Sequence, residues 1–218
     1  MPENLKNIVH YLDEILKPEK KEGLVVKKQK NIEKVALALN LNKKIIKQAQ
    51  EKCADLLIIF NPRVRSKYLK NLKISAYVSE TPITESNELK IEQTLADKLG
   101  IRVKGSFEGG YYGTSNLETI EDFKARMHKS LGIKPKVKKK KKKIGKVAVL
   151  HNFDAEWLKK AKEMGCDTVL GGRNPHIFPK AKGVNLISGE PKIIDACSII
   201  KLGETLEKKF KIKFFFIT

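Results

Sequence analysis

The segment ADLLIIFNPRVR, residues 54–65, combines residue types that point to chemistry. Its apolar residues 56–59 predict a buried strand, which ends in a loop that begins with FNP. In α/β proteins, ligands bind at the loops that follow the carboxyl ends of strands. Arg63 and Arg65 follow in this loop, and guanidinium groups bind carboxylate or phosphate through paired hydrogen bonds. The segment therefore predicts a functional loop, with anion binding as one candidate role.

The elements that position this loop occur twice in the chain. KVALALNLNKKIIKQAQEKCAD at 34–55 matches KVAVLHNFDAEWLKKAKEMGCD at 146–167, at a constant offset of 112 residues. Each copy has an apolar strand and an amphipathic helix, followed by a second strand and an Asn-Pro dipeptide, at 61–62 and 174–175. A strand–helix–strand unit of this length predicts parallel pairing. The chain therefore predicts an α/β fold with two related lobes, built by duplication of a βαβ unit.

The remaining segments also read as helices and strands. We expect helices at 1–16, 85–100, 119–132 and 198–210, and strands at 73–80 and 211–218. From these elements we expect a first lobe at 1–133, a lysine-rich linker at 134–145 and a second lobe at 146–218.

Charge is the unusual property of the composition. The 45 basic and 25 acidic residues give a net charge of +20, and such a field attracts polyanions. Residues 134–146 contain nine lysines and no acid, which is typical of a solvated linker and also of a nucleic-acid contact. No aromatic residue interrupts the run to provide a stacking platform. The nucleic-acid alternative assigns the contact to Lys138, Lys139, Lys140, Lys141, Lys142 and Lys143.

Several classes of protein are disfavoured by the same sequence. No apolar run approaches the roughly 20 residues that span a bilayer, so we expect no membrane partner. The amphipathic N-terminus does not resemble a signal peptide. Cys53, Cys166 and Cys197 show no metal-binding spacing, and we expect a reducing, cytoplasmic location.

The order of these segments resembles the Nif-three-like family (Ngg-interacting factor three, often labelled GTP cyclohydrolase I type 2 homologue). The likeness rests on EGLVV at 22–26, ADLLIIFNP at 54–62, GYYG at 110–113 and VNLISGEPKIID at 184–195, and it covers nearly the whole chain. The resemblance implies two α/β lobes facing a central cleft that holds two divalent metal ions. It also implies a homo-oligomer, a hexameric ring.

The resemblance further implies a ligand set that this chain lacks. The family's His-His pair aligns with Phe60 and Asn61. In the family's second loop, Glu80 stands where a His would be and Thr84 replaces the ligand Asp. In the last motif Glu190 replaces a His, and either Ile194 or Asp195 takes the place of the Glu. Asn61, Glu80, Glu190 and Asp195 are thus remnant positions that suit at most a hard cation such as Mg²⁺. We expect no bound cofactor and no structural metal.

Three functions remain open from the sequence. The first is a non-catalytic oligomeric scaffold that binds an anion or nucleic acid, with Arg63, Arg65 and Arg173 as anion-binding groups unless they are ordinary surface cations. The second is a metal-dependent hydrolase of the GTP cyclohydrolase I type 2 kind that acts on a nucleotide-like substrate through carboxylates. The third is a binder of a small anionic metabolite at the arginines and the glycine-rich loop 105–115. The missing ligands favour the first, a protein without catalysis.

Overall fold

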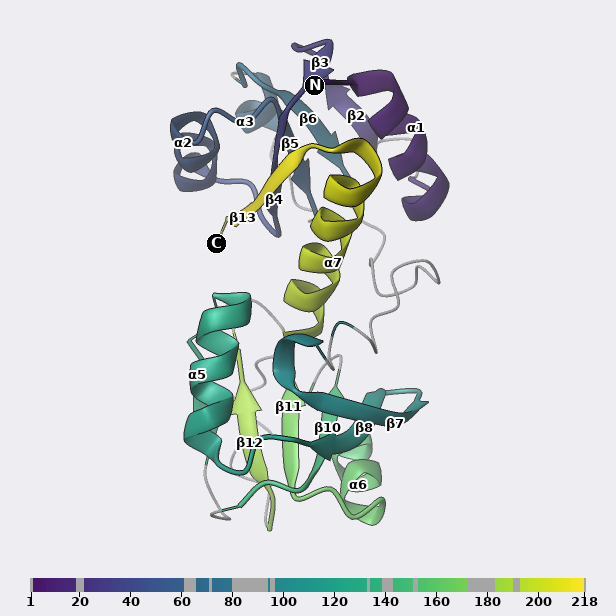
Figure 1. Ribbon diagram of the computed structural model, residues 1–218, viewed down its shortest axis with the longest axis vertical. Coiled ribbons are helices and arrows are strands. Elements are labelled where there is room, and N and C mark those ends of the chain that lie inside the picture. The colour runs from purple at the N-terminus through teal and green to yellow at the C-terminus, as the bar shows by residue number, and fades with distance from the viewer. Residues whose placement is uncertain are drawn as a thin grey trace. The chain divides into compact units, whose positions relative to one another are not determined.

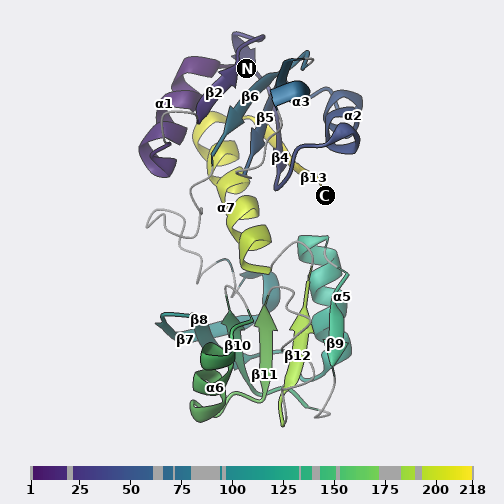
Figure 2. The same ribbon diagram turned by 180° about the vertical axis from the view of Figure 1, so that it is seen from behind.

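The structure is a computed structural model of residues 1–218. It describes residues 2–18, 22–60, 66–70, 72–79, 94, 97–132, 134–138, 143–150, 153–171, 183–189 and 193–217. The chain forms two compact units. The first unit comprises Met1–Leu89 and Ser198–Thr218, and the second comprises Lys90–Cys197. Each unit is a sheet with helices (Figures 1 and 2).

The first unit contains a mixed sheet of five strands in the order β13-β4-β5-β6-β2. Its elements are β1 (Glu3–Asn4), α1 (Leu5–Leu16), β2 (Gly23–Val26), β3 (Asn31–Ile32), β4 (Lys34–Ala38), α2 (Lys43–Glu51), β5 (Leu56–Ile59), α3 (Ser66–Lys70), β6 (Ser75–Val78) and β13 (Lys213–Ile217), together with most of α7 (Ile193–Phe210). The strands β13, β4, β5 and β6 are parallel, and β2 is antiparallel to β6. The short strands β1 and β3 pair separately.

Both faces of the first sheet are covered, which explains why its central strands are apolar throughout. On one face, α2 and α3 cover the alternate residues of the strands, such as Ala36, Leu57 and Ala76. On the other face, the hydroxyl of the buried Tyr77 donates to the Asp13 carboxylate of α1 at 2.8 Å. An edge-on contact between the rings of Tyr11 and Phe210, 5.7 Å between centroids, joins α1 to α7.

The second unit contains a mixed sheet of six strands in the order β7-β8-β10-β11-β12-β9. Its elements are β7 (Ile101–Phe107), β8 (Gly110–Ser115), α5 (Ile120–Leu131), β9 (Lys136–Lys138), β10 (Lys146–Leu150), α6 (Ala155–Glu163), β11 (Thr168–Gly171) and β12 (Asn185–Ser188). The central strands β10, β11 and β12 are parallel, and antiparallel strands flank them on both sides. α6 packs on one face through Leu158 and Ala161, and α5 lies beside β12.

The predicted duplication is confirmed in its backbone hydrogen bonds. Asn42 caps α2 by accepting from the Ile45 N–H, and Asp154, 112 residues later, caps α6. The Asp55 carboxylate accepts from the backbone N–H groups of Glu33 and Lys34 at 2.9 and 3.0 Å. Asp167 accepts from Gly145 and Lys146, at 3.0 Å in each case. The α/β fold with two related βαβ units is therefore as expected.

The duplication extends further upstream than the sequence match. α1 and α5 each have 12 residues, begin after the caps Asn4 and Thr119, and precede the edge strands β2 and β9. Asn4 pairs with Asn31, and Thr119 pairs with Lys143. Ile32 and Ile144, next along the chain, are both buried. The lysine run is therefore the second copy of the segment between β2 and β4.

The strand pairings divide the chain differently from the lobes expected at 1–133 and 146–218. β7, β8 and α5 belong to the second unit, while the C-terminal strand β13 pairs in parallel with β4 of the first. Part of the expected linker at 134–145 is strand β9, which pairs with β12. Lysines suit this place because charged side chains discourage further pairing at a sheet edge.

No helix in the described part of the chain is long and apolar enough to cross a membrane.

Candidate functional site

The carboxyl edge of the first sheet is where the FNP loop begins. The Phe60 N–H donates to the Ala38 carbonyl at 3.0 Å, and the Ser79 N–H donates to the Ile59 carbonyl at 2.9 Å. β4, β5 and β6 therefore end at one edge, and Phe60 and Ser79 extend from neighbouring strands there. This is the position at which parallel sheets bind ligands.

Most predicted site residues lie outside the described residues. These are Asn61, Arg63, Arg65, Glu80, Arg173, Glu190 and Lys139–Lys142. Three others are described. Asp195 is half-buried in the first turn of α7, Lys138 ends β9, and the exposed Lys143 pairs with Thr119. Lys138 and Lys143 thus both belong to the part of the second unit that precedes β10 in the sequence.

A dinuclear centre of imidazoles and carboxylates does not fit the donors that the structure describes. Phe60 is half-buried where the FNP loop begins, at a position where the resemblance implies a ligand, and its side chain offers only carbon atoms. His10 is exposed on α1, with its Nε2 3.4 Å from the Glu14 carboxylate, and His128 is exposed on α5. Within the described ranges, no three His, Cys, Asp or Glu side chains gather as a metal site would require.

Ser79 is a feature of this edge that the sequence reasoning missed. Its side chain is fully buried, and its hydroxyl has no hydrogen-bond partner among the described residues. Leaving a buried hydroxyl unsatisfied costs about 1–3 kcal/mol, and at the carboxyl edge this makes Ser79 a candidate ligand contact. The available signal was a small polar residue at the end of a buried strand, directly before Glu80.

The glycine-rich segment 105–115 is a β-hairpin formed by β7 and β8. A Cβ at Gly105 would lie 2.9 Å from the Tyr112 ring, and a Cβ at Gly109 would overlap the side chain of Trp157. Gly113 faces the backbone of Arg102 with no room for a side chain. These glycines therefore serve close packing, and their arrangement gives no support to a phosphate cradle.

The two buried cysteines, Cys166 and Cys197, are not activated nucleophiles. Burial raises the pKa of the Cys197 thiol to about 12, against a smaller lowering by the Lys98 ammonium. Burial also raises the pKa of Cys166. A thiol with a raised pKa remains protonated and unreactive at neutral pH.

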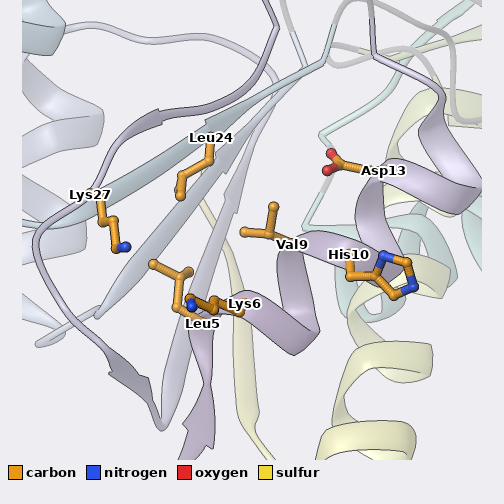
Figure 3. A pocket seen from close by; sticks show the side chains of 7 residues that line it. All are labelled: Leu5, Lys6, Val9, His10, Asp13, Leu24 and Lys27. Carbon is orange, nitrogen blue, oxygen red and sulfur yellow. The ribbon is translucent and has the colours of Figure 1, made fainter.

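A small pocket lies between α1 and the end of β2 (Figure 3). It has a volume of about 210 Å³, with an apolar lining from Val9 and Leu24 and with charged groups from Lys6, Asp13 and Lys27. Pockets for drug-sized ligands measure about 300–1,000 Å³, so this one is too small to enclose a nucleotide. Its position is remote in sequence from the FNP loop.

Comparisons with known proteins place the fold. The chain matches the family described as Duf34/NIF3 (NGG1p interacting factor 3) over residues 3–218. TTHA1606 from Thermus thermophilus is 20% identical with a TM-score of 0.70, covering 99% of this chain and 98% of that one. Reduced HcgD from Methanocaldococcus jannaschii is 19% identical with a TM-score of 0.67, at the same coverage. A Bacillus cereus protein related to NIF3 is 14% identical with a TM-score of 0.67, covering 98% and 96%. No curated protein sequence matches the chain.

Proposed function

The chain belongs to the Duf34/NIF3 family, and we propose that it is a member without the dinuclear metal centre, a non-catalytic protein that binds nucleic acid or another anion. The observation that carries this proposal is Phe60, a hydrocarbon side chain at a position where the resemblance places a ligand. Asn61, next in the chain, offers only a neutral amide in place of the second imidazole.

The charge balance supports an anionic partner. The net charge of +20 is spread over the chain, because removing the nine lysines of 134–146 still leaves +11. Arg63, Arg65 and Arg173 follow the second strand of each repeat, where guanidinium groups suit phosphate or carboxylate. In this proposal the loops that would bind cations in the family bind anions instead.

The proposal includes assembly into a homo-oligomer, for which the family resemblance suggests a hexameric ring. Light scattering coupled to size-exclusion chromatography tests this part independently. A mass near six chains of 24.7 kDa is the expected result, and a monomer at micromolar concentration contradicts it.

Metal analysis is the deciding experiment for the lost centre. Protein purified without chelator and loaded with Zn²⁺, Fe²⁺ or Mn²⁺ is desalted and measured by plasma mass spectrometry. We expect less than one transition-metal ion per chain, because such ions need nitrogen or sulfur donors for tight binding. Two retained ions per chain would contradict the proposal. The variant Phe60→His with Asn61→His restores the imidazole pair and serves as the positive control.

A metal-dependent hydrolase remains the second candidate because one sequence relation favours it. Val78 and Ser188 hold equivalent places at the ends of β6 and β12, and a glutamate follows each by two residues, Glu80 and Glu190. Repeated carboxylates at equivalent places are suited to a hard cation. Nucleotide hydrolysis that requires Mg²⁺ and is abolished by Glu80→Gln would support this candidate against the first.

A further inference from the structure

The amino edge of the first sheet, opposite to the edge of the FNP loop, is lined with lysines. Lys213 begins β13 and pairs with Lys34, which begins β4, and Lys73 lies two residues before β6. Because these three strands are parallel, their starts share one edge. Lys28 and Lys30 belong to the loop between β2 and β4. We call Lys28, Lys30, Lys34, Lys73 and Lys213 the amino-edge lysines.

The loop that carries Lys28 and Lys30 is held against this edge. The Ser75 hydroxyl, fully buried at the start of β6, accepts from the backbone N–H groups of Lys28 and Gln29, both at 3.1 Å. In return, the Ser75 N–H donates to the Gln29 side-chain oxygen at 2.8 Å. The Gln29 amide donates to the Lys73 carbonyl at 3.1 Å. These bonds fix the place of the loop, so its lysines are kept beside the strand starts.

Few carboxylates oppose these lysines. Asp55, at the start of β5, already accepts from the backbone N–H groups of Glu33 and Lys34. Glu33 is exposed in the same loop. Within the described ranges, none of the amino-edge lysines forms an ion pair, and all except the half-buried Lys34 are exposed. The edge therefore presents a row of cations that no carboxylate among the described residues pairs with.

The second repeat has a lysine-rich segment at the corresponding place in the sequence. Residues 27–33, KKQKNIE, correspond to residues 139–145, KKKKKIG, at the offset of 112. Glu33 and Gly145, the last residues of the two segments, donate their backbone N–H groups to Asp55 and Asp167, which directly precede β5 and β11. Both segments are thus rich in lysine, although the sequences of the two repeats differ at many other positions. This recurrence favours a shared role for the loop over a chance excess of surface charge.

We propose that the amino edge of the first unit binds the phosphate backbone of nucleic acid, an inference that rests on the proposed function. Strands β13 to β6 span three strand spacings, about 14 Å, which equals the axial rise of roughly four phosphates on one strand of a duplex. Residues 27–34 contain no aromatic side chain, so the contacts are with phosphate and read no base sequence. The surface is separate from the FNP loop, which lies at the carboxyl edge of the same sheet.

The test measures binding of a fluorescein-labelled 20-base-pair duplex by anisotropy at 50, 100 and 200 mM NaCl. The variant Lys28→Gln with Lys30→Gln is compared with Lys43→Gln and Lys47→Gln on α2, and both lower the net charge from +20 to +18. Removing two phosphate contacts reduces the slope of log K against log salt by about 1.8. We expect this reduction in the loop variant and an unchanged slope in the α2 variant.

The outcomes separate this inference from the proposed function. If the wild-type protein does not bind nucleic acid or other anions at 50 mM NaCl, both fail. If it binds and the two variants lose equal affinity, binding follows total charge and the amino-edge site is overturned. If neither variant loses affinity, the contact lies elsewhere and the inference is again overturned.

A neutral substitution provides a second test. Gln29→Ala changes no charge but removes the two side-chain bonds of Gln29, from the Ser75 N–H and to the Lys73 carbonyl, that help to hold the loop against β6. We expect weaker duplex binding at 100 mM NaCl, with thermal unfolding used to verify that the variant is folded. Wild-type affinity in the folded variant would contradict a binding surface that depends on the placement of this loop.

Discussion

The two βαβ repeats contain the same helix caps and the same aspartate hydrogen bonds, but they lie in different sheets. In both, an Asn or Asp caps the helix and an aspartate holds the segment before the first strand through backbone N–H groups. Their neighbours differ: β4 is flanked by the parallel C-terminal strand β13, whereas β10 is flanked by the antiparallel strand β8 of a hairpin. The comparison shows that bonds internal to the unit survived duplication, while the strands beside β4 and β10 come from unrelated parts of the chain.

The repeats also differ in backbone strain. Lys17 and Cys53 of the first repeat have left-handed φ values of 46° and 54°. At the equivalent places the second repeat has Gly132 and Gly165, with φ values of 66° and 78°. Left-handed backbone costs about 1–2 kcal/mol for a residue with a Cβ and very little for glycine. The first repeat thus carries backbone strain at two positions, and glycine removes this strain at the equivalent positions of the second repeat.

Replacing Asp55 or Asp167, which bind the segment before the first strand of each repeat, should give the largest losses of unfolding free energy. Asp167 accepts from Gly145, Lys146 and the Thr168 hydroxyl, whereas Asp55 accepts from two backbone groups. We expect Asp167→Ala to cost about 3 kcal/mol and Asp55→Ala about 2 kcal/mol of unfolding free energy, since each change orphans backbone donors.

Urea unfolding measures this difference. Trp157, the sole tryptophan, reports the second unit by fluorescence, and far-UV circular dichroism reports both units. Asp55→Asn and Asp167→Asn retain an acceptor oxygen and should lose less than the alanine variants. A larger loss for Asp55→Ala than for Asp167→Ala would break the comparison.

The packing of β13 on α7 has no counterpart in the second repeat. A Cβ at Gly203 of α7 would overlap the Phe214 ring of β13. We expect Gly203→Ala to cost about 2 kcal/mol despite the better helix propensity of alanine, because overpacking forces the ring to shift. The double variant with Phe214→Leu should recover part of this loss in a urea double-mutant cycle. Strictly additive losses would show that the two residues do not interact.

The Tyr77–Asp13 hydrogen bond distinguishes the first sheet, since Ile187 holds the equivalent place in the second. Tyr77→Phe should cost about 1 kcal/mol at pH 7. Burial, followed by the hydrogen bond to Asp13, raises the pKa of Tyr77 above its ordinary value of 10.0. Tyr77 therefore stabilises the fold fully below pH 10 and loses this contribution as the pH rises further.

The measurement is the difference in urea midpoint between the wild-type protein and Tyr77→Phe from pH 8 to pH 11. The difference should shrink above pH 10, because only the wild-type protein carries the titrating phenol. The Trp157 fluorescence transition of the second unit should respond equally in both proteins. A difference that stays constant across this range would contradict the assignment.

Exchanging glycine and non-glycine residues at the left-handed positions of the two repeats should give the smallest changes in stability. Lys17→Gly and Cys53→Gly should each stabilise the first unit by about 0.5 kcal/mol, because relief of the left-handed strain exceeds the entropy that glycine adds to the unfolded chain. Gly132→Ala and Gly165→Ala should each destabilise the second unit by about 1 kcal/mol. No neighbour lies within 4 Å of a Cβ at either glycine, so backbone conformation alone accounts for the loss. Thermal unfolding of the four variants checks the opposite signs.

The βαβ units were predictable because their evidence is local. The helical period, the caps and the apolar strands lie within 26 residues in each copy, and Gly132 ends α5 as its position after the periodic residues predicts. The upstream part of the duplication was not predictable. The helices α1 and α5 are 115 residues apart, whereas the matching segments from the lysine loop onward are 112 residues apart. A sequence comparison at the single offset of 112 therefore does not align the two helices.

The order of residues along the chain was enough to predict two repeated α/β units, since the evidence for each unit lies in neighbouring residues. The partner of β13, the strand formed by the supposed linker and the packing roles of the glycines depended on contacts between distant segments. The amino-edge lysines belong to this second group. Lys34, Lys73 and Lys213 are far apart in sequence, and only the parallel pairing of their strands brings them to one edge.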